Sequence, residues 1–386
     1  MTVKRTLFEV TLLFLKLGAI SFGGPAAHIA LMEQEVVRKR GWLSREHFLD
    51  LLAATNLVPG PNATEMAIHI GFVHAGWLGL IAGGVAFILP AFMISLTLSY
   101  IYGQFGGFPQ STAFFYGINP AVIAIILTTT YRLGKVAIKD KFALMIALFS
   151  LGAALLNVDE LLIFAIAGCM GILCYAPPKW LKRPLMLALM WIAFQPLSIL
   201  HSNSSWMDNR LVKLGLFFLK VGSMIFGSGM VLFAFIQKDI INRFGWLTQR
   251  ELIDAIAVGQ MTPGPVLSSA TFIGYLVAGW QGAIISTVSI FLPSFIIVSL
   301  LSQIIPKLRS SPVAQAFMQG VNAAVVALIL SISLSLFRAA IVDLWTLIIL
   351  LFGLVLLIRT HVDTFWVVLG GAFAGMIRYL SLGIVK

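Results

Sequence analysis

The chain of 386 residues is 59% hydrophobic and only 11% charged, with a formal net charge of +11. A soluble domain has roughly 25% charged residues, so this composition excludes an ordinary soluble protein and predicts an all-α polytopic membrane protein. The basic residues stand in short clusters between apolar stretches, where the positive-inside effect places them, so the charge does not indicate nucleic-acid binding.

The sequence lacks the motifs of the common enzyme classes. It has no G-x-x-x-x-G-K-[ST] sequence for a nucleotide, no Ser-His-Asp pattern and no H-E-x-x-H pattern. Glu65, His69 and His74 share one predicted helix but lack the further ligands that a metal requires. We therefore predict neither an enzyme nor a bound cofactor or metal.

The chain repeats itself at half its length. Phe14-Leu15-Lys16-Leu17-Gly18 returns as Phe218-Leu219-Lys220-Val221-Gly222, an offset of 204 residues. After a slip of one residue, Ala75-Gly76-Trp77 returns as Ala278-Gly279-Trp280. A half-length repeat with Gly and Pro breaks at matching places is typical of secondary transporters, whose substrate site lies where the breaks meet. We predict a first repeat over 1–176, a linker over 177–210 and a second repeat over 211–386.

The first repeat is predicted to begin with a helix from Thr6 that breaks at Gly23-Gly24-Pro25. A short helix begins at Ser44 and ends before a second break, Pro59-Gly60-Pro61, because proline cannot continue a helix. Apolar stretches of bilayer-spanning length follow, among them 78–102 and 113–131.

The linker is predicted to hold an extra apolar span over 185–200, without a counterpart after the second repeat. The second repeat then breaks at 226–229 and at 263–265, and its short helix begins with a capping box, Thr248-x-x-Glu251. Broken helices are tolerated at membrane depth only where they are buried or line a watery cavity. We therefore predict broken or re-entrant helices in both repeats.

Loop charges predict that the two repeats have opposite orientations. The connection 103–111 carries no charge, whereas its counterpart carries Lys307 and Arg309. The connection 132–141 holds four basic residues, whereas its counterpart has Arg338 balanced by Asp343. Because basic loops stay on the cytoplasmic side, the repeats are predicted to be inverted. The extra span of the linker adds one membrane crossing between the repeats and so reverses the second one.

The helices that follow the two Pro-Gly-Pro breaks start with unsatisfied N–H groups, which favour an anion. The equivalent positions of the two breaks favour a substrate site over a packing kink, the main alternative. The predicted substrate-binding residues of the first repeat are Lys16, Ser21, Gly23, Gly24, Pro25, Asn56, Pro59, Gly60, Pro61, Asn62 and Thr64. Those of the second are Lys220, Gly227, Ser228, Gly229, Gln260, Pro263, Gly264, Pro265 and Ser268.

Lys16 and Lys220 stand at one repeat position inside apolar runs, which predicts anion attraction, with snorkelling as the alternative. Glu65 and His69 form an i,i+4 pair in the first repeat alone, which predicts proton coupling, although a satisfied polar pair is the simpler interpretation. Asp50 and Asp254 occupy matching positions and are further candidates for proton coupling.

The motifs in order resemble the chromate transporter family in its long form with two homologous domains. They are Phe22-Gly23-Gly24-Pro25-x-x-His28-Ile29, Gly41-Trp42-Leu43, Asp50-Leu51-Leu52-Ala53, Val58-Pro59-Gly60-Pro61, Ile70-Gly71 and Leu89-Pro90-Ala91-Phe92. The resemblance covers nearly the whole chain. The second repeat departs from the pattern, because Gly229 replaces Pro25 and Thr262 replaces Val58.

The resemblance implies export of chromate across the bacterial cytoplasmic (inner) membrane, driven by the proton motive force and giving chromate resistance. It also implies that sulfate competes as a structural analogue, and that single-repeat relatives work in pairs of opposite orientation. A carrier of sulfate or another tetrahedral oxyanion and an oxyanion channel stay open as alternatives, as does a homodimer. The expected partners are the oxyanion and the lipid bilayer.

Overall fold

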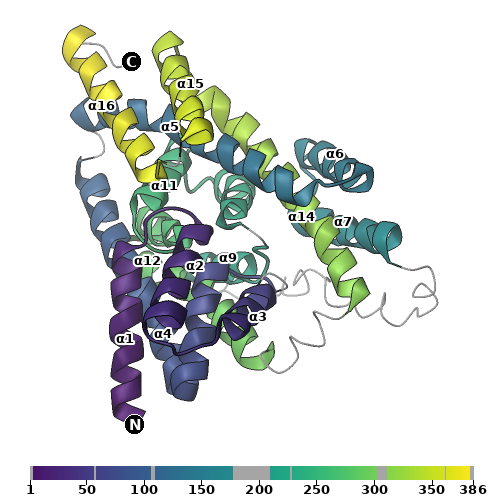
Figure 1. Ribbon diagram of the computed structural model, residues 1–386. Helices are drawn as coiled ribbons and strands as arrows, with labels where there is room; N and C mark the ends of the chain where they lie inside the picture. The colour runs from purple at the N-terminus through teal and green to yellow at the C-terminus, as the bar shows by residue number, and fades with distance from the viewer. Residues whose placement is uncertain are drawn as a thin grey trace.

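The computed structural model describes residues 3–55, 58–105, 109–176, 209–226, 228–301, 311–360 and 362–382, and every regular element within them is helical (Figure 1). The predicted all-α class is therefore confirmed. The predicted linker, with its extra span over 185–200, lies outside the described residues except for 209–210.

The first repeat contains α1 (Val3–Ile20), α2 (Pro25–Glu33), the π-helical segment η1 (Gln34–Lys39), α3 (Arg45–Thr55), α4 (Asn62–Phe105), α5 (Pro109–Ala137), α6 (Lys141–Leu155) and α7 (Glu160–Tyr175). The second contains α9 (Arg210–Gly222), η5 (Gly229–Val231), α10 (Leu232–Phe235), the π-helical segment η6 (Ile236–Arg243), α11 (Gln249–Met261), η7 (Val266–Ser268), α12 (Ser269–Leu301), α14 (Pro312–Ala340), α15 (Leu344–Arg359) and α16 (Thr364–Leu382). The elements correspond in order, down to the two π-helical segments.

Local sequence sets where these helices begin and end. The predicted capping box is present, because the Thr248 hydroxyl accepts the Glu251 N–H while the Glu251 carboxylate accepts the Thr248 N–H. The chain leaves helical geometry before each Pro-Gly-Pro, and α4 begins at Asn62, directly after Pro61. The predicted breaks are therefore confirmed.

Both α4 and α12 fold back on themselves as helical hairpins. Ala75 (φ −137°) and Gly76 (φ 64°) leave helical geometry inside α4, and Ala278 and Gly279 do the same inside α12. The positive φ suits glycine, which has no Cβ to clash. The Thr271 and Thr287 hydroxyls, 2.7 Å apart, hydrogen-bond across the α12 hairpin. Each element thus has a short and a long arm, and the sequence did not predict this turn.

The long arms of the two hairpins run in opposite directions. Along the long arm of α4, Ser95 Oγ donates to the carbonyl oxygen of Ser268 at 3.0 Å. Further along, a Cβ on Gly103 would lie 3.4 Å from the Tyr275 ring. The α4 long arm therefore runs parallel to the short arm of α12 and antiparallel to its long arm. Equivalent segments with opposite directions confirm the inverted repeats that the loop charges predicted.

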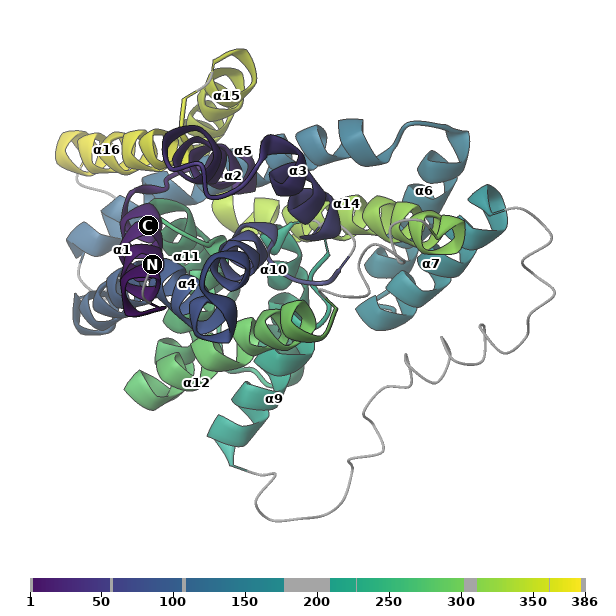
Figure 2. The same cartoon turned by 60° about the horizontal axis from the view of Figure 1, so that its bottom comes forward.

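The repeats also exchange their last two helices. α15 and α16 of the second repeat pack against α5 of the first, while α6 and α7 of the first pack against α14 of the second (Figures 1 and 2). Glycines allow the backbones to approach at both places: Gly117 of α5 lies against Gly371, and Gly320 of α14 lies against Gly171. The matching contacts give the molecule an approximate two-fold symmetry.

Five helices of the described residues are long and apolar enough to cross a membrane, namely Asn62–Phe105, Ala113–Ala137, Val266–Leu300, Pro312–Ala340 and Thr364–Ser381. Three shorter apolar helices, Lys141–Leu155, Glu160–Tyr175 and Leu344–Arg359, accompany them. The stretches predicted over 78–102 and 113–131 fall in the long arm of α4 and in α5, and the polytopic helical class follows.

Candidate functional site

The helix breaks of the two repeats meet in crossed pairs. The N–H of Gly60 donates to the carbonyl oxygen of Ile225 at 2.7 Å, and the N–H of Gly264 donates to that of Ser21 at 2.8 Å. Gly60 and Gly264 have φ values of 151° and 93°, which side-chain-bearing residues rarely adopt. Each Pro-Gly-Pro is therefore bonded to the first break of the other repeat, and we call this meeting point the break crossing.

Buried polar side chains without a hydrogen-bond partner surround the break crossing. The atoms of this cluster that have no partner among the described residues are Ser21 Oγ, Thr64 Oγ1, both carboxyl oxygens of Glu65, Ser268 Oγ and Ser294 Oγ. A Cβ placed on Gly60 would lie 2.9 Å from Ser294 Oγ and still closer to Glu65 Oε1. Since buried polar groups are nearly always hydrogen-bonded, this cluster has the capacity to bind a hydrogen-bonding ligand.

The break crossing also collects the starts of two helical arms. α4 begins at Asn62, and the Glu65 N–H bonds back to the Pro61 carbonyl at 3.0 Å. In the second repeat the Ser268 N–H bonds back to the Pro265 carbonyl at 2.9 Å. The positive ends of both arms therefore face the cluster of unpartnered groups, an arrangement that favours an anion.

The four candidates for proton coupling occupy different surroundings. Glu65 and His69 are buried one turn apart on the short arm of α4, and His69 Nε2 has no partner among the described residues. Asp254 is buried but accepts a hydrogen bond from the Tyr102 hydroxyl at 2.7 Å. Asp50, its repeat equivalent, is exposed. Of the four, Glu65 is placed at the break crossing by its close approach to Gly60.

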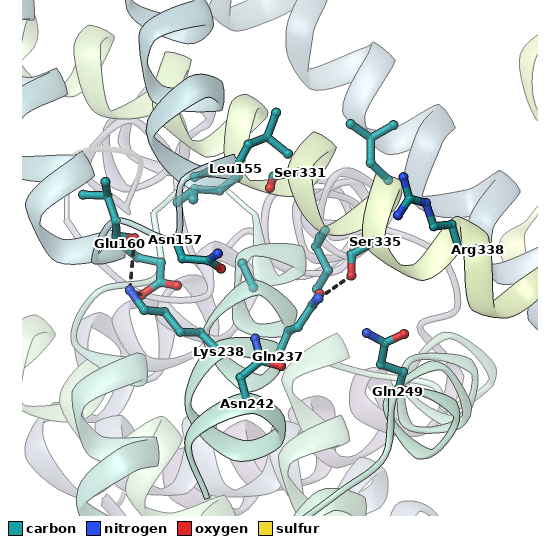
Figure 3. A pocket seen from close by; sticks show the side chains of 16 residues that line it. Leu155, Asn157, Glu160, Gln237, Lys238, Asn242, Gln249, Ser331, Ser335 and Arg338 are labelled. Atoms are coloured by element: carbon teal, nitrogen blue, oxygen red, sulfur yellow. Dashed lines mark hydrogen bonds and ion pairs between the residues drawn. The ribbon is translucent and has the colours of Figure 1, made fainter. Parts of the chain in front are cut away.

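A polar cavity of about 380 Å³ lies between the α6–α7 turn, η6 and α14 (Figure 3). Lys238 Nζ lies 3.4 Å from Glu160 Oε2 and 3.6 Å from Asp159 Oδ2, and the Gln237 amide donates to Ser335 Oγ. Its other polar lining residues are Asn157, Asn242, Gln249, Ser331 and Arg338.

Residues 8–172 and 212–376 each match the family model of the chromate transporter. The chain belongs to the chromate transporter family. A chromate transport protein of Cupriavidus metallidurans is 34% identical over 378 residues, 97% of this chain and 94% of its own. A probable chromate transport protein of Synechococcus elongatus is 32% identical over 91% of this chain and 89% of its own, and a chromate transport protein of Pseudomonas aeruginosa is 32% identical over 82% and 77%.

No solved structure matches this chromate transporter family member. Membership of the family and the apolar helices together make it a multi-pass bacterial membrane protein.

The substrate-binding residues predicted for this family member fall into three groups. Those at the break crossing are Ser21, Gly23, Pro59, Gly60, Pro61, Asn62, Thr64, Pro263, Gly264, Pro265 and Ser268. Gly24 and Pro25 are exposed at the start of α2, Ser228 and Gly229 open η5, and the Gln260 amide approaches Met230 Sδ at 3.8 Å. Asn56 and Gly227 lie outside the described residues.

Each of the two predicted anion-attracting lysines is paired with a carboxylate. Lys16 Nζ lies 3.3 Å from Glu35 Oε1, and Lys220 Nζ lies 3.2 Å from Asp239 Oδ2. The carboxylates belong to the π-helical segments η1 and η6. Hydrogen bonds from Lys39 and Lys16 hold the pKa of Glu35 below its ordinary value. The pairs tie the first helix of each repeat to its π-helical segment, and Glu35 is shared with Lys39 and Arg40.

We expect Lys220→Ala to lower the melting temperature by several degrees, and Lys16→Ala to change it little. Glu35 keeps Lys39 at 3.0 Å without Lys16, whereas among the described residues Asp239 keeps Arg243 at 4.0 Å without Lys220. Leaving a nearly buried carboxylate without a close partner costs about 1–3 kcal/mol. Thermal unfolding of both purified variants in detergent measures this. If the two variants instead had equal melting temperatures and the same rise in KM for chromate over wild type, the lysines would act in anion attraction.

Sequence reasoning missed Ser294, Tyr102 and the carboxylate partners of the lysines. Glu35 and Asp239 stand at the 204-residue offset and were detectable as a repeated feature. Ser294 replaces Ala91 of the first repeat, so the repeat gave no signal for it. Tyr102 reaches Asp254 from the other repeat, a contact that depends on how the two repeats pack.

Proposed function

We propose that the protein is a secondary transporter that exports chromate across the cytoplasmic membrane, driven by the proton motive force, and that it thereby confers chromate resistance. The observation that carries the proposal is the break crossing, with its crossed hydrogen bonds and its buried hydroxyls without partners. The family and the named relatives support chromate as the substrate. The proposal describes a carrier rather than an enzyme.

The chemistry of the break crossing suits a tetrahedral dianion with four acceptor oxygens. The first-turn N–H groups of α4 and the hydroxyls of Ser21, Thr64, Ser268 and Ser294 supply donors without adding a fixed positive charge. An inside-negative potential favours export of a dianion by roughly 4.6 kcal/mol per 100 mV. Export therefore needs no nucleotide hydrolysis. Sulfate has the same shape and charge, and we propose that it competes.

Glu65 provides the proton coupling in this proposal. An ionised carboxylate is costly to bury without a partner. Glu65 Oε1 lies against Gly60, and neither carboxyl oxygen has a partner in the described part of the chain. A protonated Glu65 fills the place that an oxyanion would take. An entering oxyanion displaces the side chain, which loses its proton to water. The break crossing then holds a proton or an oxyanion in alternation, as antiport requires.

Two buried histidines lie on the helix of Glu65 or on a helix packed against it. His69 follows Glu65 by one turn, and His28 is buried on α2, which packs against α4. Both are candidates to pass the proton. Lys16 on α1 is exposed and pairs with Glu35, and Arg45, Glu46, His47 and Asp50 on α3 are also exposed.

Counterflow in proteoliposomes tests the proposal. Vesicles loaded with unlabelled chromate are expected to take up labelled chromate faster than unloaded vesicles, because a carrier returns more quickly with substrate bound. Excess sulfate is expected to slow the uptake. Uptake without trans acceleration would indicate a channel, and strong uptake of labelled sulfate with none of chromate would indicate a sulfate carrier. Uptake no faster than in protein-free vesicles would contradict the proposal.

A further inference from the structure

The polar cavity beside η6 contains a cation that no carboxylate neutralises. Lys238 is paired with Glu160 and Asp159, whereas Arg338 has no carboxylate within 4.0 Å among the described residues. Figure 3 shows Arg338 on α14, on the same side of the cavity as Ser335. The lining carries the charges of Glu160, Lys238 and Arg338, and Asp159 lies beside it on Lys238, so Arg338 is the lining cation left free to bind an anion. The proposed transport site does not use this cavity.

Comparison of the two repeats shows why the second repeat has room there. At the offsets of 204 and 203 residues, the first repeat has charged side chains where the cavity has neutral ones. The pairs are Glu33 and Gln237, Arg38 and Asn242, Arg45 and Gln249, and Arg132 and Ser335.

The charged side chains of the first repeat are bound to one another or to backbone. Arg38 Nη2 lies 3.4 Å and Arg45 Nε 3.8 Å from Glu33 Oε1, and Arg132 Nη2 donates to the Leu357 carbonyl at 2.6 Å. In the second repeat, three neutral amides and the Ser335 hydroxyl replace them and line the cavity, and the three that replace arginines are shorter. Because the repeats are inverted, the bonded cluster and the open cavity lie toward opposite faces of the membrane.

We propose that this cavity is a second oxyanion-binding site, a vestibule in which Arg338 and the surrounding amides and hydroxyls hold a tetrahedral dianion next to the transport site. The inference rests on the proposed function. The volume of about 380 Å³ accommodates such an ion together with water. The amides of Gln237, Asn242 and Gln249 donate hydrogen bonds, and the guanidinium adds a charge-assisted one.

The vestibule connects to the break crossing through a short segment. Ala234 of α10 lines the cavity, and Ser228 at the start of η5 follows the first break of the second repeat. Five residues separate them, in the 3-10 segment η5 and the first turn of α10, which places them about 10 Å apart at 1.5–2.0 Å per residue. The wall of the cavity at Ala234 therefore lies one short step from the first break of the second repeat, on the face toward which η6 lies.

Protection of an introduced thiol tests binding directly. Ser331→Cys, in a background with Cys169→Ala and Cys174→Ala, places the thiol in the cavity wall. The probe is molybdate, a tetrahedral dianion that does not oxidise thiols. At constant ionic strength, molybdate is expected to slow labelling by a cationic methanethiosulfonate at least fivefold, and less than twofold when Arg338→Gln is added. Equal labelling rates with molybdate and with chloride would overturn the inference.

Transport kinetics provide the second measurement. Arg338→Gln is expected to raise the KM for chromate about tenfold with little change in kcat, because a charge-assisted hydrogen bond is lost. Arg338→Lys is expected to restore most of the affinity. Lys135→Gln, at the equivalent position of the first repeat, serves as the control and should leave KM within twofold.

The two measurements separate this inference from the proposed function. Protection by molybdate in a protein without chromate counterflow would leave the site standing and overturn the transport proposal. Chromate counterflow with an unchanged KM in Arg338→Gln, and no protection, would overturn the vestibule alone.

Discussion

Gly60→Ala is expected to reduce chromate counterflow at least a hundredfold while the protein still inserts in the membrane. An L-residue at a φ of 151° is strained by about 1–3 kcal/mol. Its Cβ would also press on the Glu65 carboxyl and lie 2.9 Å from Ser294 Oγ. Either strain or displacement breaks the bond from the Gly60 N–H to Ile225, and with it the geometry of the break crossing. Counterflow in proteoliposomes measures the loss.

The repeat symmetry supplies a second variant and a control for this prediction. Gly264→Ala should be similarly damaging, because its Cβ would lie 3.1 Å from Ala91 Cβ and 3.2 Å from the Gly18 carbonyl oxygen. Gly370→Ala is the control, since a Cβ on this α16 glycine meets nothing within 4 Å. If both break variants transported as well as Gly370→Ala, the break crossing would not be the transport site.

The broken helices could be predicted from sequence because their causes are local. Proline removes an N–H wherever it stands, so both Pro-Gly-Pro breaks were visible. The turns at Ala75-Gly76 and Ala278-Gly279 were visible as a repeat but not as hairpins, since Ala-Gly occurs inside many continuous helices. The positive φ of Gly76 and Gly279 accompanies the packing of the short arm of each hairpin against its long arm. No single-residue preference specifies that contact.

The exchange of α6–α7 with α15–α16 was not predictable for a related reason. An apolar helix in a membrane is compatible with many neighbours, and its choice depends on small residues that meet only in the fold. Gly117 and Gly371 are separated by more than half the chain yet their backbones touch. The inverted orientation was predictable because it depends on the charges of the loops. These can be read from the sequence without knowing which helices touch.

The sequence predicted some residues of the candidate site, but it did not predict which residues they contact. The sequence places Lys16 and Lys220 inside apolar runs but does not reveal the carboxylates that pair with them. It identified Glu65 as a polar residue of one repeat alone, and the structure adds that it has no partner in the described part of the chain. Ser269, at the equivalent position, donates to the Val266 carbonyl at 2.8 Å and is satisfied. The two repeats thus differ at this position in both charge and hydrogen bonding.

Glu46→Gln is a matched control for the variant Glu65→Gln, because Glu46 is an exposed carboxylate on α3. The same change of charge and shape there should leave both chromate counterflow and its response to a pH gradient unaltered.

His69→Gln separates the roles of the neighbouring pair: if His69 passes the proton to Glu65, this variant should slow proton flux without abolishing its coupling to chromate.

Glu65→Gln is expected to abolish the dependence of chromate transport on a pH gradient and to leave chromate–chromate counterflow within a fewfold of wild type. Glutamine has the shape of the protonated carboxyl, so an oxyanion still displaces it, but it has no proton to release. The proton flux that accompanies net chromate movement should disappear, as a pH-sensitive dye inside the vesicles would report. If Glu65→Gln still moved protons with chromate, coupling would lie elsewhere. If it lost counterflow as well, Glu65 would act in binding the oxyanion rather than in coupling it to the proton.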